Sequence, residues 1–206
     1  MKKWSSDTVF WWLAVLSVFL VVMDIFANWG DWTEVFWFCP LITLLLAYAL
    51  FRRSALFLSV CLVLSVPAQS LWALDFIFEF FGRGMGRTAM LEPCGPLIYW
   101  GSAVIHTFVI PVSFWGVARL GFERRSLVWA FVCGAILMVG TFLLTPSFKN
   151  VNCVFFPCDA DDPGGGYLRY FLTRVLLVWA LVVPLSYLFF RFVFRNNLSG
   201  FRNQGE

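Results

Sequence analysis

Residues Leu97–Ala118 read LIYWGSAVIHTFVIPVSFWGVA, and almost every position of this segment is apolar. A helix of about 20 residues is long enough to cross the hydrocarbon core of a bilayer. The segment therefore predicts a transmembrane helix. His106, the only histidine of the chain, lies near its centre. An ionisable side chain at that depth is costly in lipid, so we expect His106 to face the protein interior and to mark a functional site.

The composition extends this prediction to the whole chain. Of the 206 residues, 61% are hydrophobic and only 13% are charged, whereas soluble domains carry about 25% charged residues. Backbone groups in lipid must form hydrogen bonds within the chain, which only helices and closed barrels achieve. The long unbroken apolar runs differ from the alternating strands of an outer-membrane barrel. We therefore expect an all-α, polytopic membrane protein with a single integral membrane domain.

Six apolar segments have roughly the length of a bilayer span. The second is short, and the third contains Pro67, which removes a helix hydrogen bond and is expected to kink the helix. The first follows two lysines, as in a signal peptide, but no small-residue cleavage site follows it, so we expect a retained helix. The expected spans are 9–28, 35–51, 55–81, 97–118, 127–145 and 170–194.

Charged residues alternate between two sets of loops, one basic and one acidic. Because basic loops stay on the cytoplasmic side, we expect both termini to be cytoplasmic. The basic positions are Lys2, Lys3, Arg52, Arg53, Arg119, Arg124, Arg125, Arg191, Arg195 and Arg202. The acidic positions, expected to face outward, are Asp31, Glu34, Glu92, Asp159, Asp161 and Asp162.

Polar side chains within the predicted spans concentrate in the outward half. Trp72, Asp75 and Glu79 share one helix face by their spacing, and His106 lies about 14 Å below the outer end of its span. We expect a pocket, open to the outside, that binds or passes a small molecule with a neutral or cationic group. Its expected residues are Asp24, Asn28, Gln69, Trp72, Asp75, Glu79, His106 and Arg174.

Two other roles fit the same residues. In an intramembrane enzyme acting on lipid or quinone, His106 would be the general acid or base and Asp75 would orient it. In a structural or accessory subunit, every polar group would be paired internally. Arg174 would then bind Asp24 or Asp75, and His106 would bind Gln69. The sequence alone leaves these alternatives and the oligomeric state open.

Three cysteines, Cys94, Cys153 and Cys158, lie in predicted outward loops, where oxidising conditions favour disulfides. Cys153 and Cys158 are nearest in sequence and form the expected pair, with Cys94 as an alternative partner of either. The Cys-x-x-Cys pattern typical of thiol redox enzymes is missing from the chain. A structural disulfide is therefore expected rather than redox catalysis.

Metal and nucleic-acid sites are not expected. A single histidine without nearby cysteine cannot supply the ligands of a zinc site. The acidic cluster at 159–162 lacks the bidentate glutamate of a calcium loop. No basic tract points to nucleic acid. We therefore expect the lipid bilayer as the main partner, a small molecule or lipid as ligand, and no cofactor.

Four stretches carry a resemblance: Pro67–Phe76 (PAQSLWALDF), Ile105–Pro111 (IHTFVIP), Arg119–Arg125 (RLGFERR) and Asn150–Phe155 (NVNCVF). They resemble segments of an uncharacterised family of bacterial six-span inner-membrane proteins of about this length. The family has no assigned activity, so the resemblance implies no catalytic role. It points to Gln69, Trp72, Asp75, His106, Asn150 and Asn152 as site residues. Cys153 and Cys158 depart from the family pattern, which argues against cysteine chemistry as the shared function.

Overall fold

The computed structural model describes residues 6–83, 96–157 and 166–197, and every element in these ranges is a helix. The all-α prediction is confirmed for this part of the chain. The long helices are α1 (Ser6–Ala27), α2 (Phe38–Phe51), α3 (Ala55–Phe80), α4 (Pro96–Leu120), α5 (Ser126–Leu144) and α7 (Leu177–Val193). The short elements are η1 (Trp32–Phe36), η3 (Ser147–Lys149), η4 (Val151–Cys153), α6 (Tyr167–Tyr170) and η5 (Phe171–Leu176).

Five helical segments are long and apolar enough to cross a membrane: α1, α3, α4, α5 and the continuous run of α6, η5 and α7. The length and composition of these helices are those of a helical membrane protein. Helix α2 has 14 residues, which is about 21 Å of helix, whereas the hydrocarbon core measures about 30 Å. Five of the six expected spans are therefore long enough to cross the hydrocarbon core, and the second expected span is too short to do so fully.

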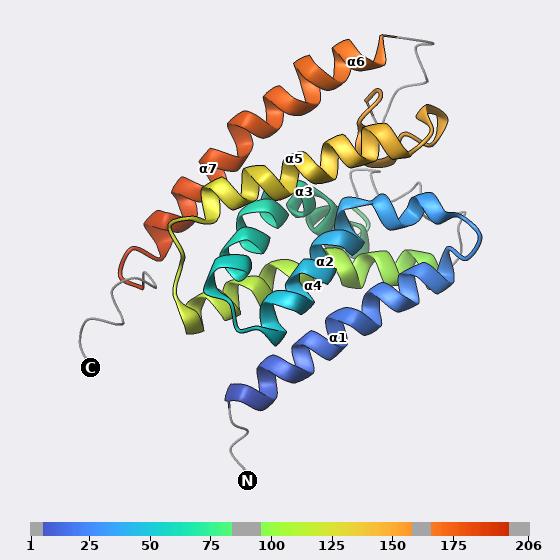
Figure 1. Cartoon of the computed structure of the whole chain (residues 1–206). Coiled ribbons are helices and arrows are strands. Elements are labelled where there is room, and N and C mark those ends of the chain that lie inside the picture. Colours follow the sequence, from blue (N-terminus) through green and yellow to red (C-terminus); the bar gives the residue numbers. More distant parts are fainter. Residues whose placement is uncertain (1–5, 84–95, 158–165, 198–206) are drawn as a thin grey trace.

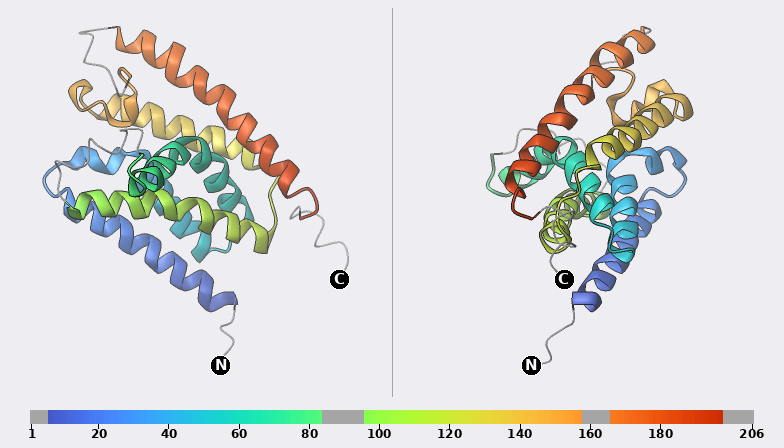
Figure 2. Two further views of the ribbon diagram at one scale, coloured as in Figure 1. Left: turned by 180° about the vertical axis from the view of Figure 1, so that it is seen from behind. Right: turned by 60° about the vertical axis from the view of Figure 1, so that its left-hand side comes forward.

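The long helices alternate in direction (Figure 1). Helices α1, α3 and α5 run one way, and α2, α4 and α7 return. As a result, the start of α1 and the end of α7 lie at the same end of the bundle in both figures (Figure 2). Because this end also carries the turns at 52–54 and 121–125, we call it the basic end, and the opposite end the loop end. Which membrane face each end meets stays a prediction from charge.

Helix α3 forms the centre of the bundle. It packs against α2, α4, α5 and α7, so all residues from Leu58 to Ser65 are buried. Gly116 lets α4 approach closely, since a Cβ at this position would lie 2.9 Å from two carbon atoms of the Leu58 side chain. At the basic end, the Ser59 hydroxyl accepts a hydrogen bond of 3.0 Å from the Glu123 amide. The basic-end half of α3 is thus a closely packed, mainly apolar core.

Candidate functional site

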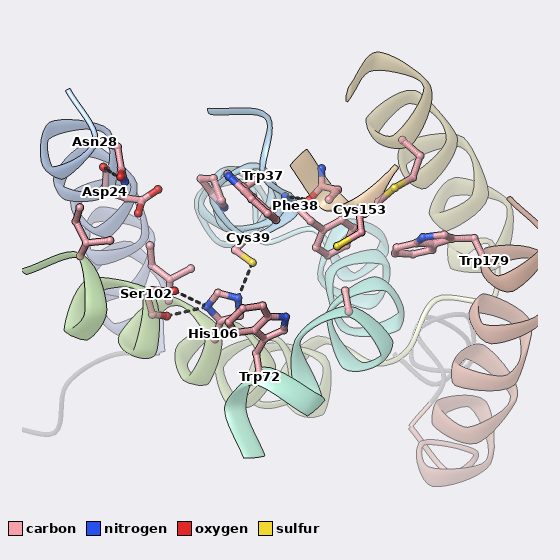
Figure 3. Close-up of a pocket in the computed structure, with 16 residues that line it drawn as sticks. Asp24, Asn28, Trp37, Phe38, Cys39, Trp72, Ser102, His106, Cys153 and Trp179 are labelled. Carbon is pink, nitrogen blue, oxygen red and sulfur yellow. Dashed lines mark hydrogen bonds between the residues drawn. The ribbon is translucent and has the colours of Figure 1, made fainter. Parts of the chain in front are cut away.

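A cavity of about 360 Å³ lies toward the loop end, with walls from α1, α2, α3, α4, α5, α7 and η4 (Figure 3). This volume falls in the range of about 300–1,000 Å³ that small-molecule sites usually have. Apolar and aromatic side chains form most of its lining. Five of the residues predicted for the pocket line it, namely Asp24, Asn28, Trp72, His106 and Asn152.

A thiol and an imidazole lie side by side in the cavity. The Sγ atom of Cys39 lies 2.8 Å from Nε2 of His106, and Figure 3 shows the two side chains pointing toward each other from α2 and α4. The other ring nitrogen, Nδ1, lies 2.8 Å from the carbonyl oxygen of Ser102. A carbonyl oxygen only accepts hydrogen bonds, so Nδ1 carries the proton in the neutral ring. Nε2 therefore holds the lone pair that accepts from the Cys39 thiol.

Aromatic rings fix the orientation of the imidazole. The ring of Trp72 lies 5.4 Å from that of His106 at an interplanar angle of 33°, and the ring of Phe76 lies 6.0 Å away. Both aromatic residues come from the part of α3 beyond Pro67. His106 itself is only 8% exposed. The imidazole is thus held by a backbone carbonyl, a thiol and two aromatic rings.

Cys39 lies in the first turn of α2, and a loop residue anchors this turn. The side-chain oxygen of Asn152 accepts a hydrogen bond of 2.7 Å from the Phe38 amide. Its amide nitrogen donates to the Phe36 carbonyl at 2.7 Å and to the Thr141 hydroxyl oxygen at 3.1 Å. Asn152 has a positive φ of 55°, a backbone conformation that asparagine adopts more readily than most residues. The η4 loop therefore positions the thiol.

Asp24 and Asn28 form the opposite wall of the cavity, on the side of α1 (Figure 3). They are four residues apart, and the Asn28 side-chain nitrogen donates to the Asp24 carbonyl oxygen at 3.0 Å. Both side chains are half-buried. Among the described residues that line the cavity, Asp24 is the one carboxylate and no arginine or lysine is present. The charged lining described by the structure is therefore acidic.

Comparison of the chain with known proteins gives no relative whose function could explain this cavity. No protein-family model, no curated protein and no solved structure matches the chain. The resemblance of Pro67–Phe76 and the three other stretches to bacterial inner-membrane proteins therefore stays a prediction. The function of the cavity has to be inferred from its own residues.

Two predicted contacts of His106 are wrong. Gln69 does not bind His106, because Cys39 and Ser102 occupy both ring nitrogens. Asp75 does not orient the imidazole for the same reason. Both Gln69 and Asp75 are fully buried on α3 but neither lines the cavity. In the described part of the chain, the side-chain amide of Gln69 has no hydrogen-bond partner.

Three further residues predicted for the pocket lie outside it. Glu79 accepts a hydrogen bond of 2.9 Å from the Tyr99 hydroxyl, at the end of α3. Arg174 is exposed on the π-helical element η5 and forms no ion pair with Asp24 or Asp75 in the described residues. The predicted ion pair is therefore wrong. Asn150 also lies outside the cavity. Its side chain forms hydrogen bonds with the backbone of residues 155 and 156 and so stabilises the loop.

The disulfide prediction is reproduced in part. Cys153 is disulfide-bonded and lines the cavity. The expected partner, Cys158, and the alternative, Cys94, lie outside the described residues. Cys39, Cys61 and Cys133 are free thiols. The acidic cluster at 159–162 also lies outside the described residues, and in the described part no group of three potential ligands could hold a metal ion.

Sequence reasoning missed Cys39 and Ser102. Ser102 precedes His106 by four residues, so helical spacing alone could have indicated that its carbonyl meets the ring. Cys39 gave no comparable signal, because it is 67 positions away from His106 and lies in an otherwise apolar stretch. Only the packing of α2 against α4 brings the thiol to the imidazole.

Proposed function

We propose that this protein binds a small amphiphilic molecule in the cavity at the loop end, in a bacterial inner membrane with both termini in the cytoplasm. The ligand carries a neutral or cationic polar group and an apolar part. The observation that carries the proposal is one cavity with the Asp24 carboxylate on one wall and the Cys39–His106 pair on another, within an apolar lining. A purely structural subunit would leave no such cavity.

The charge of the lining sets the preference for the polar group. A cation next to Asp24 gains from the low dielectric of the cavity, whereas an anion is repelled by the same carboxylate. The neutral imidazole and the thiol offer hydrogen bonds but no positive charge. The aromatic rings of Trp37, Trp72 and Trp179 line the cavity and provide apolar contact area for a chain or ring.

The test measures protection of Cys39 from alkylation in nanodiscs of phosphatidylcholine. A Cys61→Ala, Cys133→Ala background leaves Cys39 as the free thiol of the described part, and N-ethylmaleimide uptake at Cys39 is followed by peptide mass spectrometry. The probes are dodecyltrimethylammonium, dodecanol and dodecanoate, which share one chain and differ in head-group charge. The first two are expected to slow alkylation of Cys39, and dodecanoate is expected to have little effect.

Asp24→Asn should remove this preference among the probes. Asp7→Asn is the matched control, because Asp7 lies on the same helix but is exposed at the basic end and pairs with Arg53. It should leave the preference unchanged. Equal protection by all three probes, or protection by none, would contradict the proposed binding function.

A further inference from the structure

Because Cys39 lies in the first turn of α2, its backbone amide is a second chemical feature next to the thiol. Backbone amides in the first turn of a helix lack acceptors within the helix. Here the Phe38 amide donates to Asn152, Pro40 has no N–H, and the Leu41 amide donates to the Trp37 carbonyl. In the described part of the chain, this leaves the Cys39 amide as the first-turn N–H without an acceptor outside its own residue. That N–H belongs to the same residue as the thiol.

Four elements of nucleophilic acyl transfer therefore meet around Cys39. A thiol lies at hydrogen-bond distance from an imidazole nitrogen that holds a lone pair. The imidazole is oriented through its other nitrogen by a fixed acceptor, the Ser102 carbonyl. A free amide at a helix start, with the positive end of the helix dipole, can stabilise an oxyanion. This combination of nucleophile, base, orienting group and amide is the pattern of covalent acyl transfer.

We propose that Cys39 is the nucleophile of an acyl transferase or hydrolase that acts on esters of long-chain acyl groups, with His106 as its base. This inference rests on the proposed binding function, since it names the substrate class of the same cavity. The substrate is an amphiphilic ester, the class of molecule that surrounds the protein in a bilayer. Its leaving group is an alcohol whose head group is neutral or cationic, in line with the Asp24 wall.

The reaction balances without an oxidant or metal. Nε2 of His106 takes the thiol proton while Sγ of Cys39 attacks the ester carbonyl carbon, and the carbonyl electrons move to oxygen, next to the Cys39 amide. The C–O bond then breaks, and Nε2 returns the proton to the departing alcohol, which leaves a thioester on Cys39. Water, or a second alcohol or amine, attacks this thioester and releases the thiol.

The first experiment uses the full chain in nanodiscs with p-nitrophenyl dodecanoate as the probe. We expect a burst of one equivalent of nitrophenol per protein and a mass increase of one dodecanoyl group on Cys39 that neutral hydroxylamine removes. Cys39→Ser and Cys39→Ala should both lose the burst. Cys133→Ala is the matched control, because Cys133 is a half-buried free thiol on α5 that does not line the cavity, and it should keep the full burst.

His106→Gln separates the role of the base from a purely structural role. The burst rate should fall by about 100-fold, the low end of what a general base contributes. Without the base, the residual rate should rise about tenfold per pH unit as the thiol itself ionises, a steeper pH profile than that of the wild type. A variant of unchanged thermal stability with wild-type rate and profile would overturn the role of His106.

The outcomes distinguish this proposal from the proposed binding function. If the amphiphiles protect Cys39 from alkylation but no acyl group accumulates on it, the acyl-transfer proposal is wrong and binding stands. Acylation at Cys61 or Cys133 instead of Cys39 also overturns it. If neither protection nor acylation occurs, both proposals fail.

Discussion

The two halves of α3 differ in what they contribute to the molecule. On the basic-end side of Pro67, residues from Leu58 to Ser65 are all buried and mainly apolar. On the loop-end side, the same helix carries Trp72 against the imidazole and two fully buried polar side chains, Gln69 and Asp75. One half is a close-packed core, and the other half borders a cavity. The comparison indicates that close packing and the cavity are separated along the length of α3.

Pro67 lies at the boundary between these halves. Proline has no amide hydrogen, so one backbone hydrogen bond of the helix is missing there. The carbonyl that loses this bond is that of Val63, four residues earlier, and the Ser70 hydroxyl binds a different carbonyl, that of Val66. Helix α3 nevertheless continues through Pro67 to Phe80.

The largest expected effect lies in the packed half. Leu62→Ala should lower the free energy of unfolding by about 3 kcal/mol, because it removes a fully buried side chain and leaves a cavity. Leu74→Ala is the matched control on the same helix, since Leu74 is 43% exposed in the other half. Reversible unfolding in mixed detergent micelles measures both. A loss at Leu74 as large as that at Leu62 would break the comparison.

The next effect concerns the loop that anchors α2. Asn152→Ala removes three hydrogen bonds and should cost about 2 kcal/mol. It should also change the rate at which Cys39 is alkylated, because the first turn of α2 loses its anchor. Asn150→Ala should destabilise the loop as well but leave the alkylation rate of Cys39 unchanged, since the Asn150 side chain forms its hydrogen bonds with residues 155 and 156 of the same loop. Equal alkylation rates in both variants would show that the loop does not position the thiol.

A smaller effect of opposite sign is expected at Gln69. Its amide is buried and has no hydrogen-bond partner in the described residues, and an unsatisfied buried polar group is costly. Gln69→Leu, of similar volume, should therefore raise the free energy of unfolding by about 1 kcal/mol. Thermal unfolding of the reconstituted protein is the measurement. A clear loss of stability would instead mean that the amide is satisfied in the membrane.

The smallest effect is the pH dependence of a surface contact at the loop end. Lys149, and then Thr33, bind the Asp31 carboxylate and hold its pKa below the ordinary value of 3.8. A lowered pKa in the folded state adds stability above pH 3.8, and this stability is lost as the pH falls further. The unfolding temperature of Lys149→Gln should thus be slightly lower at neutral pH and equal to wild type in acid. If wild type and Lys149→Gln differed in unfolding temperature by the same amount at neutral and acidic pH, ionisation of Asp31 would not be linked to stability.

The helices could be predicted from hydropathy because lipid exposure demands long apolar runs. The cavity could be predicted only in part. His106, Trp72 and Asp24 were found because a polar or amphipathic side chain is conspicuous in an apolar span. Arg174 was misplaced, since it lies on the π-helical element η5 and its side chain is exposed outside the cavity.

Cys39 could not have been found from the sequence by the same reasoning. A cysteine resembles a small apolar residue in a predicted span, and its partner lies on another helix. The hydrogen bonds of Asn152 could not be predicted either. Asparagine is common in turns for local reasons, so its presence in a turn-rich loop does not indicate a contact with another helix. Which side chains meet across helices depends on packing, and a single sequence does not encode that in any local pattern.

The short length of α2 has a consequence for the surrounding bilayer. At about 21 Å, this helix is about 9 Å shorter than a typical hydrocarbon core, and such hydrophobic mismatch is relieved by local thinning of the bilayer or by a recessed helix end. Either response brings the glycerol backbones of adjacent phospholipids and the first turn of α2 to a similar depth. The acyl ester proposed as substrate and the Cys39 thiol would then lie in the same leaflet.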